Sequence, residues 1–79
     1  MSKKLPALKP KTVLKAFLRA DFYVYYQKGS HVQLRHTIKT HLRVNVPIHS
    51  RFDLLPFVVS SILDQAEMNK TDFLNLLRK

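Results

Sequence analysis

Residues 22–46 read FYVYYQKGSHVQLRHTIKTHLRVNV and carry the clearest secondary-structure signal of the chain. It contains three runs in which apolar and polar side chains alternate, over residues 22–27, 31–35 and 41–46. Alternation with a period of two is typical of a strand that has one buried face. Short spacers join the runs, so we expect an antiparallel three-stranded meander with one face open to solvent.

Helical spacing flanks this stretch on both sides. Apolar residues between Pro10 and Asp21 predict a first helix, with the proline in a position that a first turn tolerates. A second helix is expected after Pro56, and Asn69 is expected to cap a short third one. The order of helix, three strands and helices predicts an α+β domain with the helices packed on one face of a small antiparallel sheet.

The length of 79 residues allows one domain, spanning 1–79, in which residues 1–9 are expected to form a loose basic lead-in and residues 10–79 the folded part. No cysteine is present, which excludes disulfides, thiolate metal sites and cysteine nucleophiles. No apolar run is long enough for a signal peptide or a membrane span. We therefore expect a soluble cytoplasmic protein.

Positive charge is concentrated in the first two thirds of the chain. Residues 1–52 contain eleven Lys and Arg against the single Asp21, whereas residues 53–79 have a balance of −1. No carboxylate occurs from Phe22 to Phe52. Such polarity predicts one face for an anionic partner, of which nucleic acid is the commonest kind.

Strand parity predicts which side chains share the open face of the sheet. If Val32 and Leu34 face the helices, the residues that alternate with them face solvent. The expected open-face set is Tyr23, Tyr25, His31, Gln33, Arg35, His41, Arg43 and Asn45. Arg35 and Arg43 could hold phosphates, and tyrosine rings could stack on unpaired bases. The same alternation assigns Val24 and Tyr26 to the side of Phe22.

His31 follows Gly29, the only glycine of the chain, and Ser30. A histidine could take a proton from a ribose 2′-hydroxyl and return one to the leaving oxygen. Gly29 permits a sharp turn and close approach to a phosphate, while Ser30 offers a hydroxyl and Lys28 a positive charge. Taken alone, a histidine after a glycine is more often a turn residue than a catalyst.

The other histidines carry weaker signals. His49 follows the third strand and is a second candidate site histidine, although a loop role is about as well supported. His36 and His41 flank a hairpin turn and are expected to be surface residues. We expect no metal site and no cofactor, because the histidines lack carboxylate or thiolate companions and no phosphate-cradling loop occurs.

These segments resemble one known family. The residues from Gln27 to His31 (QKGSH), the segment VNVPIHS at 44–50, and a later Ser-Ile-Leu…Gln-Ala pattern at 61–66 are similar to HicA (YcfA-like) mRNA interferase toxins of type II toxin–antitoxin systems. The resemblance covers roughly residues 11–77. It implies a fold similar to double-stranded-RNA-binding domains, metal-independent cleavage of mRNA with His31 as the catalytic residue, and a HicB-type antitoxin partner. The toxin alone would be a monomer and would form a hetero-oligomer with the antitoxin.

The chain departs from the family pattern at three backbone positions. Members usually have glycine where this chain has Asp21, Glu67 and a residue in the region of Phe57. Aspartate tolerates left-handed conformations, so Asp21 is the easiest to accommodate, and Glu67 the hardest. These differences concern turn geometry more than catalysis.

Three hypotheses remain open at this point. The first is an endoribonuclease in which His31 moves protons while Lys28, Arg35 and Arg43 bind phosphates. The second is a non-catalytic RNA-binding module of the same shape. The third is an interaction protein whose basic face meets an acidic protein.

Overall fold

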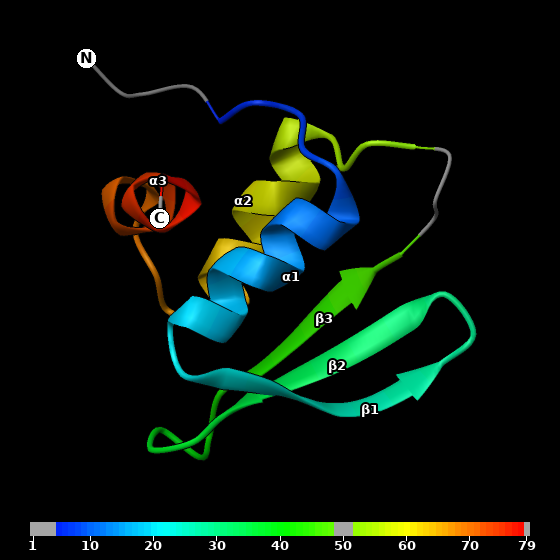
Figure 1. The fold of residues 1–79 in the computed structure, drawn as a ribbon, viewed down its shortest axis with the longest axis vertical. Helices are drawn as coiled ribbons and strands as arrows, with labels where there is room; N and C mark the ends of the chain where they lie inside the picture. The colour runs from blue at the N-terminus through cyan, green and yellow to red at the C-terminus, as the bar shows by residue number, and fades with distance from the viewer. Residues whose placement is uncertain (1–4, 49–51, 79) are drawn as a thin grey trace.

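The computed structural model describes residues 5–48 and 52–78. Three helices lie on one side of a three-stranded antiparallel sheet (Figure 1). The elements in chain order are α1 (Pro10–Arg19), β1 (Phe22–Lys28), β2 (His31–His36), β3 (Arg43–Pro47), α2 (Pro56–Gln65) and α3 (Lys70–Leu77). The strand order is β1-β2-β3, which confirms the predicted meander and the α+β class, consistent with a double-stranded-RNA-binding-like arrangement.

Local sequence signals account for the starts of the helices. Pro10 and Pro56 each occupy the first turn of their helix, where a missing N–H removes no intrahelical bond. Asn69 caps α3 as predicted, because its side-chain oxygen accepts the backbone N–H of Asp72 at 2.8 Å. Asp72 also places a negative charge in the first turn of α3, where the helix dipole favours it.

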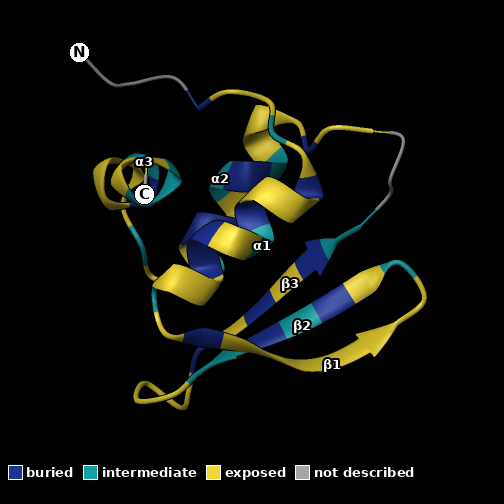
Figure 2. Cartoon of the chain, viewed as in Figure 1, coloured by how far each residue is buried: buried dark blue, intermediate teal, exposed yellow. Residues whose placement is uncertain are grey.

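The core lies between the helices and the inner face of β2 and β3. Burial alternates along these two strands, whereas β1 is exposed after its first residue (Figure 2). The largest side chains with almost no exposure are Phe17, Phe73, Leu34 and Ile62. Phe17 meets the rings of Phe22 and Phe73 at centroid distances of 5.2 and 5.9 Å, so one aromatic cluster joins α1, β1 and α3.

Two of the positions that depart from the family pattern adopt positive φ, the conformation that favours glycine. Asp21 (φ 68°) follows α1, and Glu67 (φ 53°) follows α2. At the end of α2 the N–H of Glu67 donates to Asp64 O and the N–H of Met68 donates to Leu63 O, which is the Schellman pattern. The backbone after α2 therefore keeps the turn geometry of a glycine-terminated helix, and Asp21 after α1 shares its positive φ. Phe57 differs, because it lies inside α2 without positive φ.

The expectation of a loose lead-in is wrong for the residues between 5 and 9. Leu5 is buried in the core, and Leu8 exchanges two backbone hydrogen bonds with Leu54. This isolated bridge ties the segment before α1 to the segment before α2. Residues 1–4 of the predicted lead-in lie outside the described residues.

The predicted parity of β1 is wrong in its second half. Val24 pairs with Leu34, but Tyr26 rather than Tyr25 is the next residue of β1 in register, opposite Gln33. A β-bulge at this point adds one residue to β1 and reverses the facing of the residues after it. Val24 and Tyr26 are 50% and 52% exposed, so neither contributes a buried side chain to the core.

None of the helices in the described ranges is long and apolar enough to cross a membrane.

Candidate functional site

The loop between β1 and β2 is two residues long. Lys28 pairs with His31, which leaves Gly29 and Ser30 as the loop. Gly29 has φ 58°, and Ser30 is not among the residues with positive φ. A positive φ at the first loop position alone is the pattern of a type II′ hairpin turn, which requires glycine there. Apart from Gly29 itself and its two chain neighbours, no residue has an atom within 4 Å of where a Cβ on Gly29 would stand, so conformation and not packing demands this glycine.

His31 is the first residue of β2 and is exposed. Its backbone neighbours across the sheet are Lys28 on β1 and Pro47 on β3. The carbonyl oxygen of Ser30 accepts a hydrogen bond from the N–H of Ile48, so the end of β3 is fastened to the turn. Neighbouring strands on both sides therefore hold the backbone of His31 in place, and its side chain is exposed to solvent. His49, the second candidate histidine, lies outside the described residues.

The open face of the sheet carries the side chains that strand parity assigned to it on β2, and Arg43 and Asn45 of β3. The prediction is wrong for His41, because β3 begins at Arg43 and not at residue 41, and His41 lies in the preceding turn beside Glu67. Val32 and Leu34 are buried under the helices, which turns the residues alternating with them outward. Cross-strand pairs on this face are His31 with Pro47, Gln33 with Asn45, and Arg35 with Arg43. Because residues 22–52 contain no carboxylate, the strands offer no negative charge to this face.

Arg35 and Arg43 stand directly opposite each other, an arrangement of like charges that destabilises a sheet. The guanidinium of Arg35 lies over the ring of Tyr25, with Cζ 3.9 Å from the centroid, and its Nε donates to Gln33 Oε1 at 3.2 Å. Neither contact neutralises the charge. Arg35 is four residues along β2 from His31, or about 13 Å at strand spacing. The two arginines and His31 therefore occupy different points along the open face.

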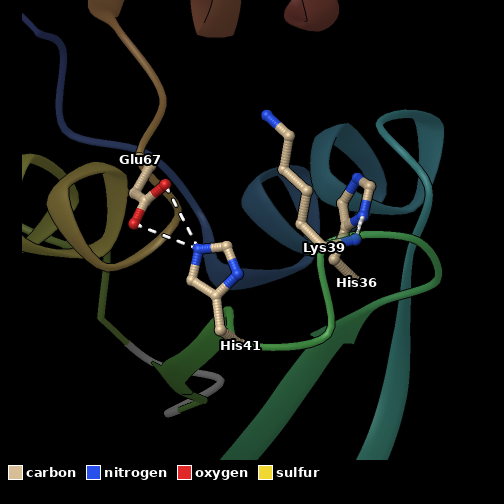
Figure 3. Close-up of polar contacts among 4 residues, drawn as sticks. All are labelled: His36, Lys39, His41 and Glu67. Atoms are coloured by element: carbon tan, nitrogen blue, oxygen red, sulfur yellow. Dashed lines mark hydrogen bonds and ion pairs between the residues drawn. The ribbon is translucent and has the colours of Figure 1, made fainter.

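The two remaining histidines lie together on another part of the surface (Figure 3). Nδ1 of His36 accepts the backbone N–H groups of Ile38 and Lys39 at 3.1 and 2.9 Å, and Nε2 of His41 lies 3.3 Å from the carboxylate of Glu67. His41 is exposed as expected, but His36 is half-buried against the edge of Phe22. The turn-capping role of His36 was not predicted from the sequence.

A surface hollow is lined by residues of this second region, including Phe22, His36, Lys39, Glu67 and Asp72. Its lining does not include His31, Lys28 or either arginine of the open face. The hollow is therefore separate from the turn that carries His31. Among the residues that the structure describes, no group of three or more His, Asp or Glu side chains is placed to hold a metal ion.

Tyr26 lies on the open face, which was not predicted from the sequence. A signal for it exists in the hairpin itself. Counting back from the pair Lys28–His31 puts Tyr26 opposite Gln33, on the open face, whereas counting forward from the buried Phe22 puts it on the covered face. The two counts can both hold only if β1 contains a bulge between Phe22 and Tyr26.

Comparison with protein families matches residues 10–68 to the family described as the HicA toxin of bacterial toxin–antitoxin systems. The matched range runs from the start of α1 through the hairpin turn and the sheet to the residue after Glu67. A search of curated proteins found no match. The matched range is well over half of the chain, and it contains the turn, the exposed histidine and the basic sheet face. The chain therefore belongs to the HicA toxin family, whose members are mRNA-cleaving toxins that act with an antitoxin partner.

Proposed function

We propose that this protein is an endoribonuclease toxin that cleaves mRNA without a metal ion, with His31 as the general acid and base. The observation that carries the proposal is the position of His31: exposed, at the head of β2, beside a tight turn and on a sheet face without carboxylates. Family membership supplies the class of activity.

The chemistry needs one imidazole and an RNA backbone. Neutral His31 takes the proton of a ribose 2′-hydroxyl, and that oxygen forms a bond to the adjacent phosphorus. The bond from phosphorus to the 5′-oxygen of the next nucleotide breaks, and the imidazolium returns the proton to that oxygen. The proton count balances, and the product ends in a 2′,3′-cyclic phosphate.

Other groups of the turn would stabilise the charge that develops on phosphorus. Lys28 stands opposite His31 in the β1–β2 register and would offer an ammonium group to the same phosphate. Gly29 has no side chain, so the backbone of the turn can approach a phosphate oxygen closely. Ser30 offers a hydroxyl. Arg35 and Arg43 would hold the RNA further along the open face.

The antitoxin partner in this proposal is a HicB-type protein that covers the open face. A surface with this excess of positive charge favours an acidic partner surface over a basic one. Such a partner would compete with RNA, and the toxin would be monomeric without it.

The test is His31→Ala, with His41→Ala as the matched control. Both variants remove one exposed imidazole, but His41 belongs to the region of Figure 3 and not to the turn. We expect His31→Ala to lose cleavage and growth arrest while RNA affinity and Tm stay close to those of the unsubstituted protein. His41→Ala should cut RNA normally. Addition of a chelator should leave cleavage intact.

Other outcomes select the other hypotheses. Unsubstituted protein that binds RNA and never cuts it would be a non-catalytic RNA-binding module. Absence of RNA binding at physiological salt would leave only a protein–protein role for the basic face. Loss of cleavage in chelator would overturn the metal-free mechanism.

A further inference from the structure

The bulge in β1 changes which aromatic rings share the open face with His31. Between the pairs Val24–Leu34 and Tyr26–Gln33, β1 has one more residue than β2. In such a bulge two successive residues oppose a single partner residue, here Tyr25 and Tyr26 opposite Gln33. Leu34 is buried under the helices and Gln33 faces away from it, so both tyrosines lie on the open side.

The two rings differ in what they contact. Tyr25 is engaged by Arg35, whose guanidinium covers its ring at 3.9 Å and is itself held by Gln33. Tyr26 is 52% exposed, and within residues 5–48 and 52–78 it has no ring–ring or cation contact. Tyr26 therefore keeps a ring face available for a ligand.

Tyr26 is also the tyrosine placed closest in register to His31. It pairs with Gln33, and His31 lies two residues before Gln33 on β2, so Tyr26 and His31 are diagonal neighbours on one face. Diagonal neighbours of an antiparallel pair lie about 7–8 Å apart, within reach of an aromatic side chain. Tyr23 pairs with Arg35 and lies a further two positions along the sheet.

We propose that Tyr26 stacks on the base of a nucleotide adjoining the cleaved bond, and that the site consequently takes unpaired RNA. This inference rests on the proposed function, because the proposed cleavage reaction is what places the phosphate of that nucleotide beside His31 and Lys28. A ring can stack only on a base that is not stacked and paired within a duplex. The fold is consistent with a double-stranded-RNA-binding-like arrangement, whereas this ring selects single strands at the point of cleavage.

Binding is measured on uncut RNA, in protein that already carries His31→Ala. Into that background we would place Tyr26→Val, which keeps a strand-forming residue, and Tyr26→Phe, which keeps the ring. The probes are a fluorescent single-stranded RNA and the same strand annealed to its complement. The matched control is Phe57→Val, which removes an aromatic ring that is 72% exposed on α2.

We expect Tyr26→Val to weaken single-strand binding about 10- to 100-fold, as loss of one stacked base does. Tyr26→Phe should restore most of that affinity, and Phe57→Val should change nothing. Duplex affinity should be the same in all four proteins. In protein with His31 intact, Tyr26→Val should raise KM for single-stranded substrate more than it lowers kcat, with Tm unchanged.

Three results would overturn the assignment. The first is that Tyr26→Val binds single strands as tightly as its parent. The second is that it loses as much affinity for the duplex as for the single strand. The third is that it loses affinity only for the antitoxin, which would make Tyr26 a contact for that protein. The proposed function fails by a different result, namely single-strand binding by the unsubstituted protein without cleavage. That outcome leaves the stacking role of Tyr26 standing.

Discussion

The carboxylate of Glu67 lies 3.3 Å from Nε2 of His41, which brings the end of α2 against the connection between β2 and β3. Glu67 makes this contact from a left-handed backbone conformation. Both side chains are mostly exposed, at 59% and 64%, so the pair contributes little to stability. A residue with a Cβ in this conformation is disfavoured by about 1–2 kcal/mol. Glutamate therefore occupies a backbone conformation in which glycine would be more stable.

Glycine at position 67 should stabilise the fold relative to alanine. Both Glu67→Gly and Glu67→Ala remove the contact with His41, but only glycine relieves the backbone. We expect the glycine variant to be more stable by about 1 kcal/mol. For a domain of this size that difference raises Tm by roughly 4–8 °C. Urea titrations of the two variants check this, and equal midpoints would show that the left-handed conformation at Glu67 carries no strain.

Arg43→Gln should change folding and RNA binding in opposite directions. Removing one of two facing guanidiniums relieves like-charge repulsion with Arg35, worth about 0.2–1 kcal/mol of stability. If Arg43 contacts a phosphate, the slope of log K against log salt becomes shallower by about 0.7 for single strands. Arg78→Gln, at the exposed end of α3, is the control with the same charge change. Equal salt slopes in the two variants would remove Arg43 from the RNA-binding surface.

Gly29→Ala should destabilise the hairpin although there is space for a methyl group. The positive φ of Gly29 is the cause, because no residue beyond its two chain neighbours has an atom within 4 Å of the added Cβ. We expect a loss of about 1 kcal/mol for alanine and a smaller loss for Gly29→Asn, since asparagine is among the residues that the positive-φ positions of hairpin turns accept. Equilibrium unfolding of the two variants measures the order. If Gly29→Asn destabilised the protein as much as Gly29→Ala, the cause would be a steric clash of the added side chain and not the backbone conformation at residue 29.

His36 should matter for stability and not for cleavage. His36→Ala removes the acceptor for the Ile38 and Lys39 N–H groups and the edge contact with Phe22 at 4.8 Å. We expect a loss of about 1–2 kcal/mol from the two contributions together. His36→Asn restores a hydrogen-bond acceptor without the ring, so its stability should lie between that of His36→Ala and that of the unsubstituted protein. Cleavage by the folded fraction should equal that of the unsubstituted protein, and a fall to the level of His31→Ala would place His36 in the chemistry.

Much of the fold could be predicted from neighbours in the sequence. The prolines at 10 and 56 and the cap at Asn69 marked helix starts, and the three alternating runs marked the strands. These signals act within a few residues, through φ restriction, side-chain capping and strand pleating. The turn beside His31 belongs to the same class, because only glycine suits its first position.

The order of elements, the presence of a turn at Gly29, the exposure of His31 and the charge of the open face all follow from the sequence. Tertiary structure alone decided the packing of Leu5, the contact of Glu67 with His41 and the facing of Tyr26. The reason is that each of these depends on partners distant in sequence. In β1, the aromatic core holds Phe22 at one end and the hairpin holds Lys28 at the other. Strict alternation from Phe22 to Lys28 cannot satisfy both positions, because β1 has one residue too many. The bulge takes up that residue and places Tyr26 on the same face as His31.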